Sequence, residues 1–347
     1  MGGLVGVAQV GCGYWGPNLL RNLVSDTGCE VKTVVDQAEE RRAFVGRRYP
    51  AVRVTGDLQE ALKDPDVDAV VIATPVATHF GLAMAALEAG KHILVEKPMA
   101  RTVAEVKRIG VLAQEKDLTA MSGHTFLYNA AVRRLKQLID SGEIGEVRYI
   151  YSQRLNLGRI RQDVDALWNF APHDISIIQY LLGDPAPVSV SGHGMDYIQK
   201  GVDDVVFLNV TYPGKVMANV HVSWLDPQKT RRLTVVGSRK MVVYDDVSEN
   251  KITVYDKGID RMAALGRDMD FDNPNLFSYN HRAGDILMPK VAFEEPLKVE
   301  IRHFLECVKG TAECITGPEH TLEVVRILSL AGRGAHGIRA IEGDEAA

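Results

Sequence analysis

Apolar positions recur with two different periods along the first 120 residues. Short apolar runs that are typical of strands, such as Leu4–Val10 and Ala69–Ala73, alternate with stretches such as Asn18–Ser25, whose apolar residues recur at helical spacing. Ala69–Ala73 is apolar at every position, as expected of a strand that is covered by helices on both faces. Strands alternating with helices over this length predict a parallel, doubly wound sheet.

The pattern changes in the second half of the chain. From Val147 to about Tyr255, strand-like runs follow one another, with turn signals at Pro213-Gly214 and Gly237-Ser238. This order is typical of a mainly antiparallel sheet. Helical patterns are expected at Asp174–Leu182, Leu297–Val308 and Glu319–Leu330, and the Gly-, Asp-, Asn- and Met-rich residues 258–290 are expected to be irregular.

These patterns predict an α/β protein of two domains. Residues 1–122 are expected to form a Rossmann-type doubly wound parallel sheet. Residues 123–347 are expected to form an α+β domain with a large, mainly antiparallel open sheet.

The long strands of the second half predict an interface. One face is apolar throughout, at Val216, Ala218, Val220, Val222 and Trp224, whereas the alternate positions are mixed. A half-apolar outer face is usually covered, and the helical patterns of this half leave no helix to cover it. We therefore expect a homodimer or homotetramer that assembles through this sheet.

Composition narrows the function classes. The 347 residues carry 40 Lys and Arg against 45 Asp and Glu, a formal net charge of −5. We therefore expect neither a nucleic-acid partner nor a basic membrane-binding surface. No apolar run reaches the roughly 20 residues of a membrane-spanning helix, and no secretory signal pattern opens the chain. Four scattered cysteines predict neither a disulfide framework nor a metal site, and reduced thiols indicate a cytoplasmic location.

A glycine motif lies between the first strand and the first helix. Residues 11–16 read G-C-G-Y-W-G. In this context Gly11 permits a tight turn, Gly13 lets a pyrophosphate approach the backbone, and Gly16 allows close packing of helix on strand. The phosphates would lie at the helix N-terminus, with Tyr14 and Trp15 beside them. The motif predicts a dinucleotide cofactor.

Asp36, at the end of the second strand pattern, indicates which dinucleotide. It follows Gly16 by twenty residues, where a carboxylate accepts hydrogen bonds from the adenosine ribose and repels a 2′-phosphate. Arg41 and Arg42 could serve such a phosphate, but no basic residue is adjacent to Asp36. The sequence therefore favours NAD, with NADP as the alternative.

Several motifs in order resemble the Gfo/Idh/MocA family of sugar and cyclitol oxidoreductases. They are the glycine motif, Ala73-Thr74-Pro75 with His79, Glu96-Lys97-Pro98, Gly123-His124, Gly142-Glu143-Ile144-Gly145 and Pro172-His173-Asp174. The resemblance extends over essentially the whole chain. It implies that Lys97 and His173 are the catalytic polar groups, and that Thr74, Pro75, His79, Glu96 and Lys97 belong to the cofactor site.

Physical chemistry agrees with these roles. Ligands of open α/β sheets bind outside the carboxyl ends of the strands, where Lys97 is expected to lie. A lysine there would hydrogen-bond the reacting hydroxyl, and an imidazole could remove its proton at neutral pH. Many family members carry an aspartate four residues before this histidine, but here that residue is Asn169, so Asp174 or Asp165 could supply the charge instead.

Basic and amide residues before His173 suggest a substrate class. Arg154, Asn156 and Arg159, with Arg282 further along, could clamp a diphosphate and bind sugar hydroxyls together with Asn169, Lys97 and His173. They could equally be surface charges or subunit contacts. The chain most resembles the branch that oxidises the 3-hydroxyl of UDP-N-acetylglucosamine-type sugars for surface-polysaccharide synthesis. The alternatives are a free sugar or inositol dehydrogenase, an NADPH-dependent keto-sugar reductase, or a silent NAD-binding sensor.

Overall fold

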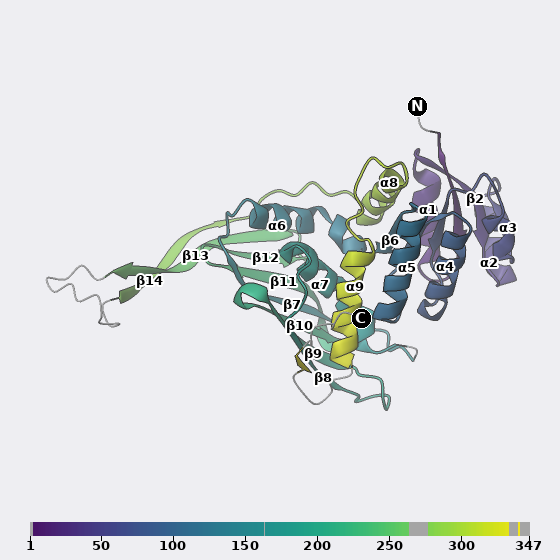
Figure 1. Ribbon diagram of the computed structural model, residues 1–347. Coiled ribbons are helices and arrows are strands. Elements are labelled where there is room, and N and C mark those ends of the chain that lie inside the picture. Colours follow the sequence, from purple (N-terminus) through teal and green to yellow (C-terminus); the bar gives the residue numbers. More distant parts are fainter. Residues whose placement is uncertain (1–2, 163, 264–276, 333–338, 341–347) are drawn as a thin grey trace. The chain divides into compact units, whose positions relative to one another are not determined.

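The computed structural model describes residues 3–162, 164–263, 277–332 and 339–340 (Figure 1). The chain forms two compact units. The first comprises Met1–Asn129, Ile175–Tyr180 and Phe293–Ser329, and the second comprises Ala130–Asp174, Leu181–Ala292 and Leu330–Ala347.

The first unit contains the predicted parallel sheet. Its six described strands have the spatial order β3-β2-β1-β4-β5-β6, and every pair is parallel. The strands are β1 (Val5–Val10), β2 (Cys29–Val35), β3 (Arg53–Thr55), β4 (Ala69–Ile72), β5 (His92–Glu96) and β6 (Ala120–Gly123). All residues of β1 and β4 are buried, as expected for strands that are covered by helices on both faces.

Helices follow the strands of the first unit as the pattern predicted. They are α1 (Gly16–Ser25), α2 (Glu39–Arg48), α3 (Leu58–Leu62), the 3₁₀ helix η1 (Val76–Thr78), α4 (His79–Glu88), α5 (Val103–Glu115) and the 3₁₀ helix η2 (Thr125–Tyr128). Local chemistry sets their ends. For example, Thr102 and Glu105 form a capping box at the start of α5, where each side chain accepts a backbone N–H.

Two helices from the end of the described chain belong largely to the first unit. They are α8 (Pro296–Val308) and α9 (Pro318–Gly332), at the positions that the sequence predicted. The single predicted boundary at residue 122 did not anticipate this return of the chain. Apolar faces that are far apart in sequence can share one core, and sequence periodicity does not say which faces do.

The second unit contains a nine-stranded sheet in the described residues, with the order β14-β13-β12-β11-β7-β10-β9-β8-β15. Only β7 and β10 pair in parallel there; the other described pairs are antiparallel. The strands are β7 (Val147–Leu157), β8 (Ser189–Met195), β9 (Val205–Tyr212), β10 (Val216–Ser223), β11 (Leu225–Gly237), β12 (Met241–Asp245), β13 (Ile252–Ala263), β14 (Phe277–Leu287) and β15 (Arg339–Ala340). Helix α6 (Ala130–Asp140), helix α7 (Ala166–Leu182) and the 3₁₀ helix η3 (Pro213–Lys215) complete the elements.

Both predicted hairpin turns are confirmed. Gly214 adopts φ 72° between β9 and β10, a conformation that glycine accepts readily, and β11 ends at Gly237, directly before the turn to β12.

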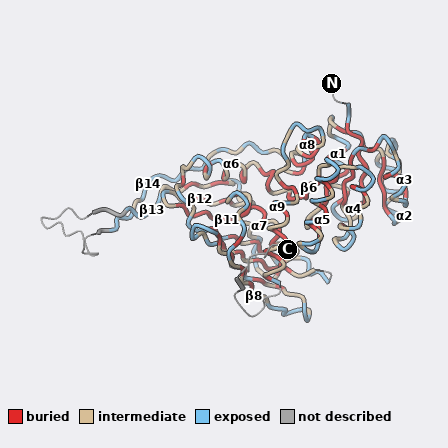
Figure 2. Tube along the Cα trace, in the orientation of Figure 1, coloured by how far each residue is buried: buried red, intermediate tan, exposed pale blue. Residues whose placement is uncertain are grey.

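Two local predictions in this unit are wrong. Residues 258–290 were expected to be irregular, but β13 and β14 pair there, and the described part of this hairpin is largely exposed (Figure 2). The strands carry β-forming residues such as Ile259 and Tyr279 among the polar ones, and cross-strand ion pairs join Arg282 to Asp256 and Asp260. Helix α7 begins at Ala166, before the predicted Asp174, and contains Pro172. The Asp165 carboxylate accepts the Trp168 N–H at its first turn, which supports the earlier start.

The two faces of the antiparallel sheet differ as the alternation predicted. Ala218, Val220, Val222 and Trp224 are buried. On the opposite face Tyr149, Tyr151, Phe207 and Met217 are exposed. Two pairs of rings stack on this exposed face. Phe207 stacks on His221 with ring centroids 4.2 Å apart, and Tyr149 stacks on Tyr151.

Candidate dinucleotide and active site

The glycine loop follows β1 and leads into α1. Gly11 has φ 92°, and a Cβ there would lie 2.5 Å from the Ala73 carbonyl oxygen. A Cβ on Gly16 would lie 2.6 Å from the Gly11 carbonyl oxygen, so both positions exclude a side chain. At Gly13 the nearest atom to a Cβ would be 3.5 Å away, on the Arg41 guanidinium. The tight positions therefore fix the turn, and Gly13 leaves its backbone open to approach.

Asp36 lies directly beside this loop. Its carboxylate accepts the Cys12 N–H at 2.7 Å and the Ala38 N–H at 2.9 Å. The Arg41 guanidinium lies 3.6 Å from the same carboxylate. The contacts hold the end of β2 against the glycine loop, where a carboxylate can meet a ribose.

The loop after β4 is tied to the loop after β5 by His79. This ring is buried, and its two nitrogens lie 2.8 Å from the carbonyl oxygens of Thr74 and Pro98. Burial lowers the pKa of His79, and the two carbonyls oppose that shift. His79 thus links the segment of Thr74 and Pro75 to that of Lys97, and its recorded partners are backbone groups of the protein.

Glu96 and Lys97 stand at the carboxyl end of β5, on the same sheet edge as the glycine loop. The Lys97 N–H donates to Glu96 Oε2 at 3.2 Å, and the Trp15 indole also donates to this carboxyl. Burial raises the pKa of Glu96 to about 7, against the opposing charge of Lys97. Trp15 therefore connects the glycine loop to the lysine segment, whereas its neighbour Tyr14 is almost fully exposed.

His173 lies in the second unit, half-buried on α7 directly after Pro172. Asn169 lies one turn earlier and is also half-buried. Of the two candidate aspartates, Asp165 accepts the Trp168 N–H at 2.8 Å, and burial raises its pKa. Asp174 accepts hydrogen bonds from Ser152 and Arg154.

Arg154, predicted to bind substrate, lies in a buried ion pair. Its Nε donates to Asp174 Oδ2 at 2.6 Å, and Ser152 donates to Asp174 Oδ1 at 2.6 Å. The two charged side chains are only 7% and 4% exposed. The pair joins β7 to α7, so the guanidinium has a structural partner that the sequence pattern did not indicate.

The other predicted substrate residues lie at the surface of the second unit. Asn156 lies over Gly158, where a Cβ would be 2.5 Å from its amide nitrogen, and Arg159 is exposed. Arg282 lies on the β13–β14 hairpin, paired with Asp256 and Asp260.

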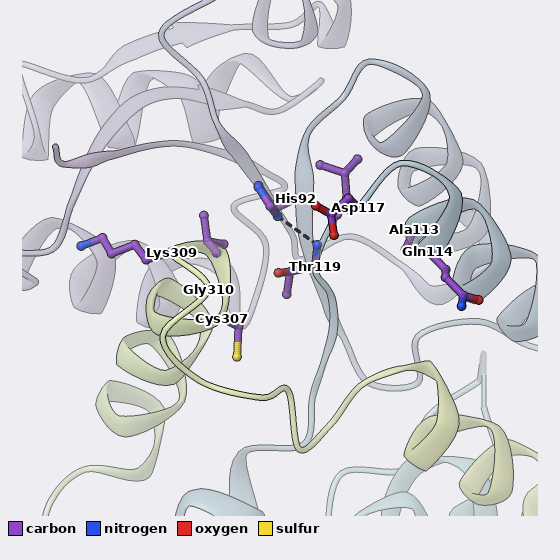
Figure 3. Close-up of a pocket in the computed structure, with 10 residues that line it drawn as sticks. His92, Ala113, Gln114, Asp117, Thr119, Cys307, Lys309 and Gly310 are labelled. Carbon is purple, nitrogen blue, oxygen red and sulfur yellow. Dashed lines mark hydrogen bonds between the residues drawn. The ribbon is translucent and has the colours of Figure 1, made fainter. Parts of the chain in front are cut away.

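A polar cavity of about 430 Å³ lies at the opposite end of the first sheet (Figure 3). It is lined by His92, the first residue of β5, by Thr119, just before β6, and by Cys307 and Lys309 at the end of α8. The Thr119 N–H donates to His92 Nδ1 at 2.9 Å. Because it opens at the amino ends of the strands, it is separate from the glycine-loop site.

Sequence reasoning missed a buried acid in the first unit. Glu300 is fully buried on α8, and Thr125 donates to its Oε2 at 2.8 Å. The available signal was its position: Glu300 falls on the helical face formed by Leu297, Ile301 and Phe304, where a charge is unexpected.

No helix in the described residues combines the length and apolar character needed to cross a bilayer. No group of three or more His, Cys, Asp or Glu residues in that part of the chain is arranged to hold a metal ion.

Comparison with known proteins gives matches over most of the chain. A family model described as an oxidoreductase family with an NAD-binding Rossmann fold, GFO_IDH_MocA, matches residues 5–124. The GFO/IDH/MocA C-terminal domain model matches residues 132–243.

The relatives include dehydrogenases of several substrates. The scyllo-inositol 2-dehydrogenase (NAD(+)) of Bacillus subtilis is 27% identical over 91% of this chain and 90% of its own length. The 4-carboxy-2-hydroxymuconate-6-semialdehyde dehydrogenase of a Sphingobium strain is 32% identical over 51% of this chain, and the match spans only 59% of that protein.

Among solved structures, UDP-N-acetylglucosamine 3-dehydrogenase GnnA from Acidithiobacillus ferrooxidans superposes with a TM-score of 0.77. It is 22% identical and covers 95% of this chain and 99% of its own. At that identity the likeness shows a shared fold.

Proposed function

Because the chain belongs to the Gfo/Idh/MocA family of oxidoreductases, we propose that it is an NAD-dependent dehydrogenase of a sugar secondary alcohol. The observation that carries this proposal is the edge of the parallel sheet. There the glycine loop, Asp36 and Lys97 all follow the carboxyl ends of strands. This is where open α/β sheets bind their ligands.

The residues at this edge fit NAD. Gly13 leaves its backbone open for a pyrophosphate at the N-terminus of α1. Asp36, already positioned by Cys12 and Ala38, would accept hydrogen bonds from the ribose hydroxyls. A bound NAD would supply the acceptor for the hydride that leaves the carbon bearing the alcohol.

In this proposal Lys97 and His173 divide the chemistry on the hydroxyl group. The Lys97 ammonium donates to the oxygen and stabilises the negative charge that develops on it. His173 removes the hydroxyl proton as general base. The family motif supports both roles, and the proximity of Glu96 supports a charged Lys97.

The proposed substrate is a nucleotide sugar of the UDP-N-acetylglucosamine type, oxidised at the 3-hydroxyl. Exposed Arg159 could bind the diphosphate, and Asn156 and Asn169 could bind hydroxyls. We propose that Arg154 and Arg282 contribute less to binding the diphosphate, because both already form ion pairs with aspartates. The inositol dehydrogenase among the relatives supports the second candidate, a free sugar or inositol.

We further propose that the enzyme is cytoplasmic and assembles through the outer face of the antiparallel sheet. The aromatic and apolar side chains of Tyr149, Tyr151, Phe207 and Met217 give that face the character of an interface.

A substrate panel tests the function. UDP- and dTDP-sugars, free hexoses and inositols are each incubated with the protein and NAD, and NADH absorbance is followed. Turnover confined to UDP-N-acetylhexosamines is expected. Turnover of inositols alone supports the second candidate. Tight NAD binding without turnover of any member would refute the proposed dehydrogenase and favour an NAD-binding sensor.

A further inference from the structure

Two glutamates of the first unit, the half-buried Glu96 and the fully buried Glu300, place their carboxyl groups around one short segment, residues 123–125. Glu96, at the end of β5, lies against Gly123, where a Cβ would be 3.2 Å from its Oε2. Glu300, on α8, accepts the Thr125 hydroxyl at 2.8 Å. The segment that follows β6 therefore lies between two acids whose positions differ by about two hundred residues in the sequence.

The two carboxyls are unequally satisfied. Glu96 accepts the Lys97 N–H and the Trp15 indole. Glu300 is fully buried, and its Oε1 has no hydrogen-bond partner among the described residues. A buried carboxylate with one hydrogen bond is strongly disfavoured relative to its protonated form. Burial accordingly raises the pKa of Glu300 well above its usual range, and the charge of Glu96 raises it further.

The neighbouring titratable groups do not neutralise two negative charges. His124 is buried with both ring nitrogens unpartnered in the described structure, and burial, His320 and Lys97 hold its pKa well below the usual range. His320 packs edge-on against His124 and bonds the Ser176 hydroxyl. Tyr128 stays neutral because burial raises its pKa. Among the described groups of this cluster, Lys97 is the cation beside Glu96, and Glu96 in turn interacts with Glu300.

We propose that Glu96 and Glu300 hold one proton between them at neutral pH, and that their remaining negative charge keeps Lys97 positioned and protonated. Glu96 and Glu300 are thus positioning residues that act through Lys97. The consequence for chemistry rests on the hydroxyl-binding role proposed above for Lys97. The shared proton itself does not depend on that role.

The test measures the carboxyl groups directly and needs no substrate. Protein labelled with ¹³C at the glutamate side-chain carboxyl is titrated by NMR from pH 4 to pH 10. The wild type should show two carboxyl resonances that titrate above pH 6, whereas ordinary glutamates are ionised by about pH 5.5. Glu96→Gln and Glu300→Gln should each remove one of them. Glu306→Gln is the matched control, because Glu306 lies on the same helix with its side chain 49% exposed, and it should remove neither.

Coupling distinguishes a shared proton from two independent buried acids. In Glu96→Gln the midpoint of Glu300 should fall by about one pH unit or more, because Glu300 no longer ionises beside a charged partner. In the double variant the Lys97 ammonium, followed by ¹⁵N NMR and assigned with Lys97→Ala, should lose its proton at lower pH. An unmoved Glu300 midpoint, or wild-type carboxyls that all titrate below pH 6, would overturn the proposal. A protein that passes this test but oxidises no substrate would refute only the proposed function.

Discussion

The ion pair of Arg154 and Asp174 makes a prediction that separates a structural arginine from a substrate-binding one. Arg154→Met leaves the Asp174 carboxylate buried, with the Ser152 hydroxyl as its remaining recorded side-chain partner at 2.6 Å. The two charged side chains are only 7% and 4% exposed. We therefore expect the free energy of unfolding to fall by about 3–5 kcal/mol, the range found when one member of a buried pair is removed. With a urea dependence of about 3 kcal/mol/M, a loss of about 4 kcal/mol lowers the unfolding midpoint by about 1.3 M.

The assay is urea unfolding followed by tryptophan fluorescence, since Trp168 and Trp224 both lie in the same unit as the pair. The matched control is Arg232→Met, which breaks an ion pair with Asp245 on the same sheet. Because the Arg232 side chain is 50% exposed, the free energy of unfolding should fall by only about 0–1 kcal/mol. In Arg154→Met combined with Asp174→Leu, the midpoint should return toward that of the wild type, because no unpaired buried charge remains. An unchanged midpoint in Arg154→Met, together with a raised KM for a nucleotide sugar, would contradict this reasoning and assign Arg154 to the substrate.

Three further predictions concern cofactor, catalysis and assembly. The wild type should bind NAD more tightly than NADP, and Asp36→Ser with Gln37→Arg should shift that preference toward NADP; fluorescence titration of both cofactors measures it, and a wild-type preference for NADP would contradict it. His173→Ala and Lys97→Ala should each lower turnover by at least about a hundredfold with NAD affinity nearly unchanged. The His173 variant should also lose the acid limb of the pH profile, and near-normal turnover would move the base elsewhere. Light scattering should show a dimer or tetramer at micromolar concentration and a smaller species for Phe207→Glu, whereas a monomeric wild type would count against the interface.

The fold followed from the sequence wherever a local pattern decides the structure. The strands and helices of the first 120 residues, the turn at Gly214 and the alternation of apolar positions through Val220 and Val222 all appear as predicted. The exceptions have local causes as well. The β13–β14 hairpin forms because β-forming residues such as Ile259 and Tyr279 lie among the Gly, Asp and Asn residues that suggested an irregular segment, and α7 starts before Pro172 because Asp165 caps it.

Part of the candidate site could likewise be predicted from the sequence, and part could not. The glycine loop, Asp36 and Lys97 could be located from the sequence, because each follows a strand end and the carboxyl ends of parallel strands share one edge. The contacts that His79 and Arg154 make could not be predicted from the sequence. His79 joins two loops through backbone carbonyls, and Arg154 is committed to Asp174, which lies twenty residues later.

The sequence by itself determined the parallel sheet and the dinucleotide loop, because short-range periodicity and turn residues specify those features directly. Its ordered motifs carried the resemblance to the family. Only the tertiary structure decided which charges are buried and which groups face them. Thr125 and Glu300 are 175 positions apart, yet they share a hydrogen bond beside Gly123 and Glu96. The protonation of such groups depends on solvent exclusion and neighbouring charge, and both arise only when distant segments pack together.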